Sequence, residues 1–226
     1  MKALVLLSGG IDSSTCLAKA VEQYGSAEVL ALTTYYGQRH KKEIESARKI
    51  AEYYSVKHKE LDLSVVFDGL KNPLMEKSDK EVPDGRYAEQ LEKVNGDPVS
   101  TYIPFRNGMF LCVAAVIGML NGCKKLYYGA HADDAAGNAY PDCSTDFNKA
   151  INDAVYIGSG KKISVEAPFI NMNKAEVVKE GLMLGVPYEL TWSCYKGEDE
   201  PCRKCATCID REEAFEKNGI IDPLLR

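Results

Sequence analysis

An apolar run that leads directly into a glycine-rich turn restricts what this chain can fold into more than any other feature. Residues 3–7 read Ala-Leu-Val-Leu-Leu, and Ser8, Gly9 and Gly10 follow at once. Such a run is typical of a parallel strand covered on both faces. It is too short for a signal-peptide core, so we expect no secretory leader. Residues 13–24 then carry apolar side chains at helical spacing, which completes a strand–turn–helix unit.

Strand-like and helix-like segments alternate along the rest of the chain. This alternation is typical of βαβ units, and it predicts an α/β fold with a doubly wound, mostly parallel, Rossmann-like sheet. Residues 66–100 lack a clear period, and we interpret them as an excursion near the active site. We expect further strands at residues 29–36, 57–63, 125–130 and 163–169, and further helices at 41–54, 110–120, 146–156 and 174–184.

Composition and charge exclude several classes of protein. The 226 residues are 45% hydrophobic and 27% charged, as in an ordinary globular protein. The formal net charge of −5 argues against a broad surface for nucleic-acid phosphates. No run of eighteen apolar residues exists, so no membrane span is predicted. We expect a cytoplasmic protein that acts on a small molecule.

The turn after the first strand has the properties of an anion site. Its two glycines allow close approach of the backbone and positive φ angles, and Asp12, Ser13 and Ser14 occupy the start of the next helix. Free amides and the helix dipole at that point attract phosphate. The turn lacks the Gly-Lys-Ser/Thr ending of a Walker loop and the spacing of the dinucleotide fingerprint. We therefore predict a phosphate site of another type.

Four of the eight cysteines gather near the end of the chain, with intervals of seven, two and two residues: Cys194, Cys202, Cys205 and Cys208. Four thiolates at this spacing suit tetrahedral Zn²⁺, and a filled coordination shell makes the ion structural. An iron–sulfur cluster and unrelated buried cysteines are the alternatives. We predict one zinc ion in a helical region at residues 191–226, after a main domain at residues 1–190.

Two other cysteines lie on helices predicted to be apolar. Cys16 belongs to the first helix and Cys112 to the helix at residues 110–120. Small, weakly polar thiols are common in protein cores. We therefore expect both side chains to be buried.

Three charged residues begin predicted helices or follow predicted strands. Arg106 opens the apolar helix and can neutralise phosphate charge, although it can equally be an exposed arginine. Asp133 follows a strand, where a carboxylate suits Mg²⁺; simple helix capping is the alternative. Lys174 begins a helix and is a further candidate for contact with phosphate.

Two short strings contain candidates for binding an organic substrate. Gln38, Arg39 and His40 follow the second strand, at the edge of the sheet where ligands gather. Tyr140 can stack on a ring, and Asp142 can accept hydrogen bonds from a guanine-like N–H edge. Taken alone, the first string fits surface residues as well as ligands, and the second is somewhat more typical of an ordinary surface turn.

Motifs along nearly the whole chain resemble one enzyme family. The SGGIDSS loop resembles the pyrophosphate loop of the N-type ATP pyrophosphatases, which have the adenine nucleotide alpha hydrolase-like fold. The strings YGQRH, RN, GAHADD, YPDC and NKAE and the terminal cysteines add a resemblance, within that superfamily, to the 7-cyano-7-deazaguanine synthases of queuosine-precursor synthesis.

The resemblance implies a ligase that uses ATP, Mg²⁺ and ammonia to convert 7-carboxy-7-deazaguanine into the nitrile. Acid and amide are each adenylated, with release of pyrophosphate and AMP. It implies catalytic roles for Asp12, Arg106, Asp133 and Lys174, and a homodimer. It also implies that the substrate contacts Gln38, Arg39, His40, Tyr140 and Asp142, and that the nucleotide is held by Ser8, Gly9, Gly10, Ile11, Asp12, Ser13, Ser14, Thr15, Cys16, Leu17 and Ala18.

Other functions remain open at this point. The same loop occurs in tRNA-thiolating and lysidine-forming ligases, but the acidic chain lacks the basic surface that tRNA binding requires. A relative that adenylates a protein or DNA acceptor is also compatible with the motifs. A non-catalytic zinc-knuckle module predicts a degenerate loop, whereas this loop is intact.

Overall fold

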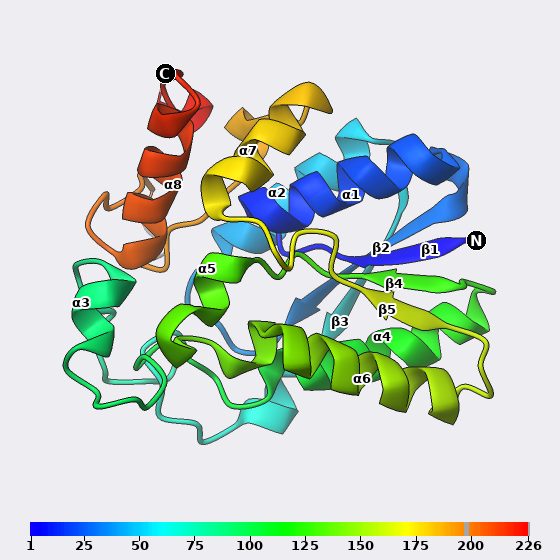
Figure 1. Cartoon of the computed structure of the whole chain (residues 1–226), viewed down its shortest axis with the longest axis horizontal. Coiled ribbons are helices and arrows are strands. Elements are labelled where there is room, and N and C mark those ends of the chain that lie inside the picture. The colour runs from blue at the N-terminus through cyan, green and yellow to red at the C-terminus, as the bar shows by residue number, and fades with distance from the viewer. Residues whose placement is uncertain (197–198, 226) are drawn as a thin grey trace.

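The computed structural model describes residues 1–196 and 199–225, and within them one parallel sheet organises the chain (Figure 1). The strands have the order β3-β2-β1-β4-β5, and every pairing is parallel. Strands are added on both sides of β1, so the predicted doubly wound α/β sheet is confirmed. The strands are β1 (Ala3–Leu6), β2 (Val29–Tyr35), β3 (Lys57–Asp62), β4 (Lys125–Tyr127) and β5 (Ser164–Glu166).

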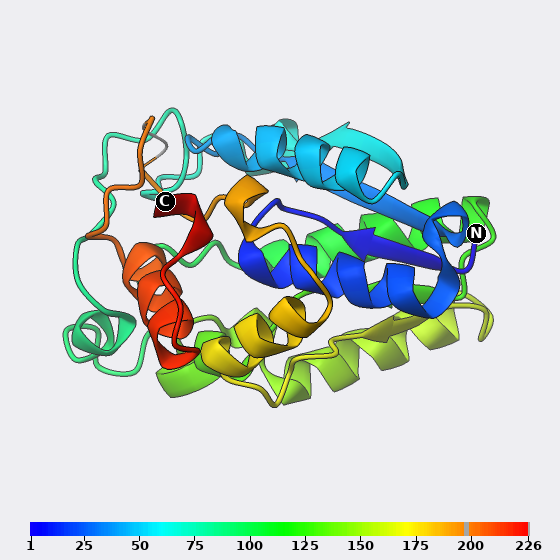
Figure 2. The ribbon, with the colours of Figure 1, turned by 90° about the horizontal axis from the view of Figure 1, so that it is seen from above.

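Helices cover both faces of the sheet (Figures 1 and 2). One face carries α1 (Ile11–Tyr24), α2 (Lys42–Tyr53) and α7 (Lys174–Met183), and the other carries α4 (Arg106–Leu120) and α6 (Thr145–Gly158). Three further helices lie near the carboxyl ends of the strands: α3 (Tyr87–Leu91), α5 (Ala132–Ala135) and α8 (Ala206–Lys217). In the described residues, no helix has both the length and the apolar character needed to cross a membrane.

Single-turn 3-10 helices lie in the connections between these elements. They are η1 (Ser26–Glu28), η2 (Ser64–Phe67), η3 (Ala136–Asn138), η4 (Pro141–Cys143), η5 (Tyr188–Leu190) and η6 (Pro223–Leu225).

The first strand is buried on both faces, as its continuous apolar sequence predicts. Ala3 and Val5 pack into the core beneath α1 and α7, and Leu4 packs into the core beneath α4 and α6. All three side chains are fully buried. Side chains that alternate between two covered faces leave no position for a polar residue.

The carboxyl ends of β1 and β4 meet where the winding of the sheet reverses, and the backbone is tightly packed there. A Cβ atom at Gly129, just beyond β4, would lie 2.8 Å from the Asp12 carbonyl carbon and 2.9 Å from the Ser13 nitrogen. Only glycine allows this approach. The loop after β4 therefore lies directly against the loop after β1, at the switch point where open α/β sheets bind ligands.

The prediction for Cys112 is wrong, whereas Cys16 is buried as expected. Cys112 is exposed on the outer face of α4, in line with Val116 and Leu120 one and two turns later. The helix sequence is apolar on nearly every side, so its pattern does not reveal which face the sheet covers. An apolar stripe, which we define as Cys112, Val116, Met119 and Leu120, remains at the surface.

Residues 66–100 pack on the side of the molecule where the strands have their carboxyl ends (Figure 1). The Arg39 guanidinium donates hydrogen bonds to the backbone carbonyls of Met75, Ser78 and Lys80, at 3.4, 3.1 and 3.0 Å. Further along, Asp84 pairs with Cys205 in an isolated β-bridge, and α3 lies beside α8 (Figure 1). The excursion thus lies against the C-terminal cysteines.

Buried polar contacts cross the predicted domain boundary between residues 190 and 191. The Arg211 guanidinium, on α8, forms a buried ion pair with Asp222 at 2.6 Å. It also donates to the Tyr188 carbonyl at 3.0 Å and the Thr191 hydroxyl at 2.8 Å. The boundary stays a prediction, and the two sides of it share one hydrogen-bond network.

Candidate active site

A cavity of about 210 Å³ lies at the carboxyl edge of the sheet. The glycine-rich loop, the ends of β1, β2 and β4, the start of α4 and the segment after η5 form its walls. Its lining residues include Ser8, Gly10, Asp12, Ser13, Tyr36, Gln38, His40, Arg106, Phe110, Asp134, Lys174, Trp192 and Tyr195. Residues far apart in the sequence therefore share one pocket.

Hydrogen bonds between its own serines and close contact with α2 fix the conformation of the glycine-rich loop. The Ser13 hydroxyl accepts from the Ser8 amide at 3.1 Å and lies 3.0 Å from the Ser8 hydroxyl. Gly9 has a φ of +90°, and a Cβ there would lie 2.3 Å from the Glu43 carbonyl oxygen. No side chain among the described residues caps the start of α1. The first amides of that helix are therefore available to an anion.

Beside the loop, one lysine is held among acidic groups. We call Asp12, His131, Asp134 and Lys174 the lysine cluster. The Lys174 ammonium donates to Asp12 Oδ2 at 2.5 Å and lies 3.3 Å from His131 Nε2. His131 Nε2 in turn lies 3.3 Å from Asp134 Oδ2. The cluster places a positive charge directly beside the loop amides.

Burial and charge shift the pKa values of this cluster in opposite directions. Burial alone would raise the pKa of Asp12, but the charges of Lys174 and His131 hold it below its usual value. Burial raises the pKa of Asp134, and the Asp12 and Asp133 carboxylates raise it further, against the lowering effect of His131 and Lys174. Burial would lower the pKa of Lys174, yet Asp12 and Asp134 raise it. Lys174 is therefore a stable cation at neutral pH.

Of the adjacent carboxylates Asp133 and Asp134, it is Asp134 that lines the cavity, whereas the sequence predicted Asp133. Asp133 Oδ2 accepts a hydrogen bond from the Lys174 amide at 2.7 Å, at the start of α7. It therefore satisfies the first amide of α7, whose N-cap residue is Asn173, and does not cap its own helix α5. Asp134 faces the cavity and His131. This placement speaks against a metal-binding role for Asp133.

Arg106 lies in a separate, aromatic part of the cavity. Its guanidinium donates to the Tyr36 hydroxyl at 3.1 Å and lies 5.4 Å from the centre of the Tyr36 ring. Phe110 and Tyr195 line the cavity beside it. Burial alone would lower the pKa of Arg106, but the Tyr36, Tyr195 and Asp142 groups raise it, so the charge persists.

The residues of the YGQRH string have different environments. Gln38 and His40 are buried and line the cavity. The Gln38 side-chain oxygen accepts from the Tyr36 amide at 2.8 Å, and the His40 ring lies 5.4 Å from the Tyr195 ring. Arg39 points instead into the excursion, as described above. The structure brings two of the three predicted residues to the pocket.

Tyr140 and Asp142 lie behind the cavity wall. The Tyr140 hydroxyl contacts the Thr101 hydroxyl at 2.7 Å and the Tyr87 hydroxyl at 3.1 Å. Asp142 Oδ2 accepts from the Asn107 amide at 2.9 Å and so caps the start of α4. Neither residue is among the described residues that line the cavity. Both support the part of the wall that carries Arg106.

The predicted nucleotide-binding residues divide at the first turn of α1. Ser8, Gly10, Ile11, Asp12 and Ser13 line the cavity. The later positions point into the core, where the Thr15 hydroxyl donates to the Ile11 carbonyl at 2.8 Å. The residues whose side chains are buried away from the cavity are Ser14, Thr15, Cys16, Leu17 and Ala18.

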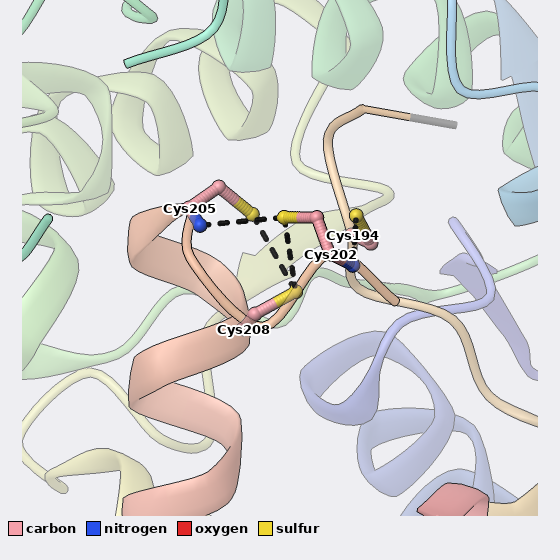
Figure 3. A group of neighbouring side chains, drawn as sticks. All are labelled: Cys194, Cys202, Cys205 and Cys208. Carbon is pink, nitrogen blue, oxygen red and sulfur yellow. Dashed lines mark hydrogen bonds between the residues drawn. The ribbon is translucent and has the colours of Figure 1, made fainter. Parts of the chain in front are cut away.

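The four C-terminal cysteines form one compact cluster (Figure 3). Their sulfur atoms all lie within 4.8 Å of one another. The Cys205–Cys208 and Cys202–Cys208 sulfur separations are 3.5 and 3.9 Å. Tetrahedral zinc with sulfur ligands at about 2.3 Å needs separations of about 3.8 Å. The donor set and these separations are compatible with a tetrahedral metal ion such as zinc.

The cysteine cluster also carries part of the pocket wall, which the sequence did not predict. Tyr195 directly follows Cys194, and both Tyr195 and Trp192 line the cavity. The Trp192 amide donates to the Gly9 carbonyl of the loop at 2.9 Å. In the sequence, the signal for this role is that Tyr195 directly follows Cys194, a predicted metal ligand.

Comparison with known proteins decides the family. The model of the family "Queuosine biosynthesis protein QueC" matches residues 2–219. The chain belongs to this family. A 7-cyano-7-deazaguanine synthase of Archaeoglobus fulgidus is 46% identical over 100% of this chain and 90% of the relative. A 7-cyano-7-deazaguanine synthase of Caldicellulosiruptor bescii is 41% identical over 99% of this chain and 96% of the relative.

Two solved structures confirm the fold of this QueC family member. The U34-tRNA thiolase NcsA of Methanococcus maripaludis, solved with its [4Fe-4S] cluster, superimposes with a TM-score of 0.52 at 18% identity, over 96% of this chain and 67% of that chain. The NMN synthetase of Francisella tularensis gives a TM-score of 0.50 at 14% identity, over 96% of this chain and 77% of that chain. At these identities the similarity concerns the fold alone.

Proposed function

We propose that this protein is an ATP-dependent ligase that converts 7-carboxy-7-deazaguanine and ammonia into 7-cyano-7-deazaguanine in the cytoplasm. One observation carries the proposal: a loop with free helix amides and an aromatic subsite with a partly buried arginine lie in a single cavity. The names of the relatives, which match nearly the full chain, support the choice of substrate.

The loop and the lysine cluster are suited to the nucleotide. A carboxylate is a poor electrophile, so its oxygen must first attack the α-phosphate of ATP. The departing pyrophosphate carries several negative charges, which the free amides of α1 and the Lys174 ammonium can bind. Because Asp12 fixes the ammonium, little reorganisation is needed as charge develops. Ammonia then displaces AMP to give the amide.

The same site must act twice to reach the nitrile. Adenylation of the amide oxygen makes it a leaving group, and loss of AMP with the amide protons leaves the carbon–nitrogen triple bond. Both steps require an acceptor oxygen held near the α-phosphate. The aromatic side chains of Tyr36, Phe110 and Tyr195 provide faces on which a flat heteroaromatic ring can lie. The protein's contribution is mainly placement and charge neutralisation.

Asp12 and Asp134 are the carboxylates suited to hold Mg²⁺ at the triphosphate. Both line the cavity beside the loop, and oxygen ligands are those that Mg²⁺ prefers. Asp12 Oδ1 is buried, forms no hydrogen bond within the part of the chain that the structure describes, and lies 3.7 Å from His131 Nε2, so a metal ion could take it as a ligand. A bound magnesium ion supplies further neutralisation of phosphate charge.

The test of this function is a product assay with the zinc-loaded protein. It is incubated with Mg-ATP, ammonium and 7-carboxy-7-deazaguanine, and mass spectrometry follows AMP, pyrophosphate and the deazapurine. Formation of the nitrile together with AMP is the expected result. Formation of AMP only with another acceptor refutes the substrate, and formation of ADP refutes the role of the loop.

A homodimer is part of the proposal, and the apolar stripe on α4 supports it. Val116 and Leu120 are 54% and 81% exposed, although the helix is apolar on nearly every side. A helix of this kind is usually covered on all sides, and exposed apolar patches commonly mark interfaces between proteins. A second copy of the chain is the partner that the resemblance implies.

The Val116→Glu variant is expected to be monomeric at micromolar concentration, whereas the wild type is a dimer. Burying an unpaired carboxylate at the centre of an apolar interface costs several kcal/mol, which lowers the dimerisation constant by roughly 10²-fold or more. Analytical ultracentrifugation measures the change. The matched control is Met183→Glu, because Met183 is also exposed but lies on α7, over the opposite face of the sheet. A monomeric wild type refutes the dimer.

A further inference from the structure

We propose that Arg106 binds the carboxylate of the acid substrate and thereby distinguishes the acid from the neutral amide that forms from it. The inference rests on the proposed function and goes beyond the phosphate role that the sequence favoured. It begins from a partly buried cation that forms no ion pair among the described residues.

Most of the hydrogen-bonding capacity of Arg106 is unused. A guanidinium has five N–H donors in a planar fork. In the described residues, Arg106 makes one side-chain hydrogen bond, to the Tyr36 hydroxyl at 3.1 Å, and no carboxylate forms an ion pair with it. Arg106 is partly buried, and a charge withdrawn from water is usually paired, because the lost hydration costs free energy that a counter-ion restores. An anionic ligand would complete the site.

Asp142, the carboxylate that helps to raise the pKa of Arg106, is already engaged. Asp142 is buried, and its Oδ2 accepts from the Asn107 amide at the start of α4, at 2.9 Å. It stabilises the guanidinium charge at a distance and leaves the fork free. Since Asp142 also occupies the anion-attracting end of α4, a ligand anion would be held by the side chain of Arg106.

The surroundings of Arg106 distinguish it from the phosphate end of the cavity. Lys174 is held by Asp12 and faces Asp134, close to the loop amides. The groups that act most strongly on Arg106 are Tyr36, Tyr195, Asp142 and Tyr140, and none of these belongs to the lysine cluster. The cavity thus has cations at two positions, Lys174 and Arg106. Lys174 belongs to the proposed phosphate site, which leaves Arg106 for another anion.

The chemistry around Arg106 fits a carboxylate attached to an aromatic ring. The planar fork matches a carboxylate through two parallel hydrogen bonds. The Tyr36 ring, which lies against the guanidinium, and the Phe110 and Tyr195 rings line the same region of the cavity. A flat ring placed between these side chains would direct its carboxylate to the guanidinium. The proposed acid has this combination of groups, whereas the triphosphate has only the charge.

The neutral amide provides a direct test of the proposal. It keeps the ring and loses the negative charge, so an arginine that recognises the charge affects the acid far more than the amide. Calorimetry measures the dissociation constants of the acid, the corresponding amide and α,β-methylene-ATP for each variant. For Arg106→Gln, we expect the acid to bind on the order of 100-fold more weakly, because a charge-assisted pair that the ligand would shield from water is lost. The amide and the nucleotide analogue should change less than about threefold.

Two further variants keep the test informative if Arg106→Gln folds poorly. Arg106→Lys retains the charge but loses the fork, so it should weaken acid binding by roughly tenfold and still prefer acid to amide. Arg48→Gln is the matched control, because Arg48 forms a surface ion pair with Glu60 outside the cavity. It should leave all three constants unchanged.

The outcomes separate this inference from the proposed function. Weaker binding of α,β-methylene-ATP with unchanged acid binding would assign Arg106 to phosphate and overturn the inference. An equal loss for acid and amide would also overturn it, since the ring and not the charge would then be recognised. If the wild type binds the acid and the nucleotide but the variants match it, the function stands and the inference fails. If the wild type binds neither, the proposed function fails and the inference with it.

Discussion

Replacing Lys174 with methionine is expected to lower kcat/KM for AMP formation by roughly 10³-fold, because a preorganised cation at a site of developing charge contributes on this scale. Methionine fills a similar volume and removes only the charge. The Lys174 ammonium lies 2.5 Å from Asp12 and beside the loop amides, where the departing pyrophosphate is proposed to bind. Initial rates of pyrophosphate release at saturating and limiting ATP measure the loss.

The same substitution also destabilises the fold, and this effect depends on pH. Asp12 and Lys174 are only 22% and 18% exposed, and breaking a buried pair leaves one charge uncompensated, at a cost of about 3 kcal/mol. Without Lys174, burial raises the folded-state pKa of Asp12 above its unfolded value. The folded state then binds the extra proton, so the destabilisation is largest at neutral pH and decreases as the pH falls through the raised pKa.

Two comparisons separate the catalytic loss from the loss of stability. Lys19→Met removes an ion pair with Glu180 at 2.6 Å outside the cavity, and should change neither the rate nor the stability by much. The double variant Lys174→Met with Asp12→Asn should recover most of the stability and none of the activity. Full activity in the single variant would remove Lys174 from the proposed mechanism.

The strands and main helices were predictable because their signal is local. Residues 3–7 are apolar without interruption, and residues 174–184 begin with a capping box at Asn173 and Glu176. The structure has the strand at Ala3–Leu6 and the helix at Lys174–Met183, close to both predictions. Hydrophobic period and helix caps depend on neighbours in the chain, so they are visible without the tertiary structure.

Orientation around an element was much harder to predict. Asp133 and Asp134 are adjacent carboxylates at one helix start, and only packing against α7 makes the first an acceptor for the Lys174 amide and the second a wall of the cavity. Cys112 lies on a helix with no polar face, so its sequence does not indicate which side faces solvent. Tyr195 reaches the pocket because the cysteine cluster places it there. These positions depend on contacts between distant segments.

Replacing Cys205 with serine is expected to abolish zinc binding and to lower the melting temperature by about 10 to 20 °C. The hydroxyl is a poor ligand for this ion, and a structural zinc site contributes several kcal/mol to folding. For a chain of this size, each kcal/mol shifts the melting temperature by about 2 to 4 °C. Metal analysis and thermal unfolding of the purified variant measure both effects. Cys112→Ser is the control, because Cys112 lies outside the cluster.

The same variant also tests whether the cysteine cluster supports the active site. Trp192 and Tyr195 line the cavity, and the Trp192 amide holds the Gly9 carbonyl of the loop at 2.9 Å. Loss of zinc should therefore weaken binding of α,β-methylene-ATP at temperatures where the variant is still folded. Since coupling between two sites is reciprocal in free energy, the bound nucleotide should also raise the affinity for zinc, measured by equilibrium competition with a chelator. If a folded, zinc-free variant binds the nucleotide as tightly as the wild type, the ion stabilises only the fold around the cysteines. If the purified wild type contains iron, the cluster is the iron–sulfur alternative and not a zinc site.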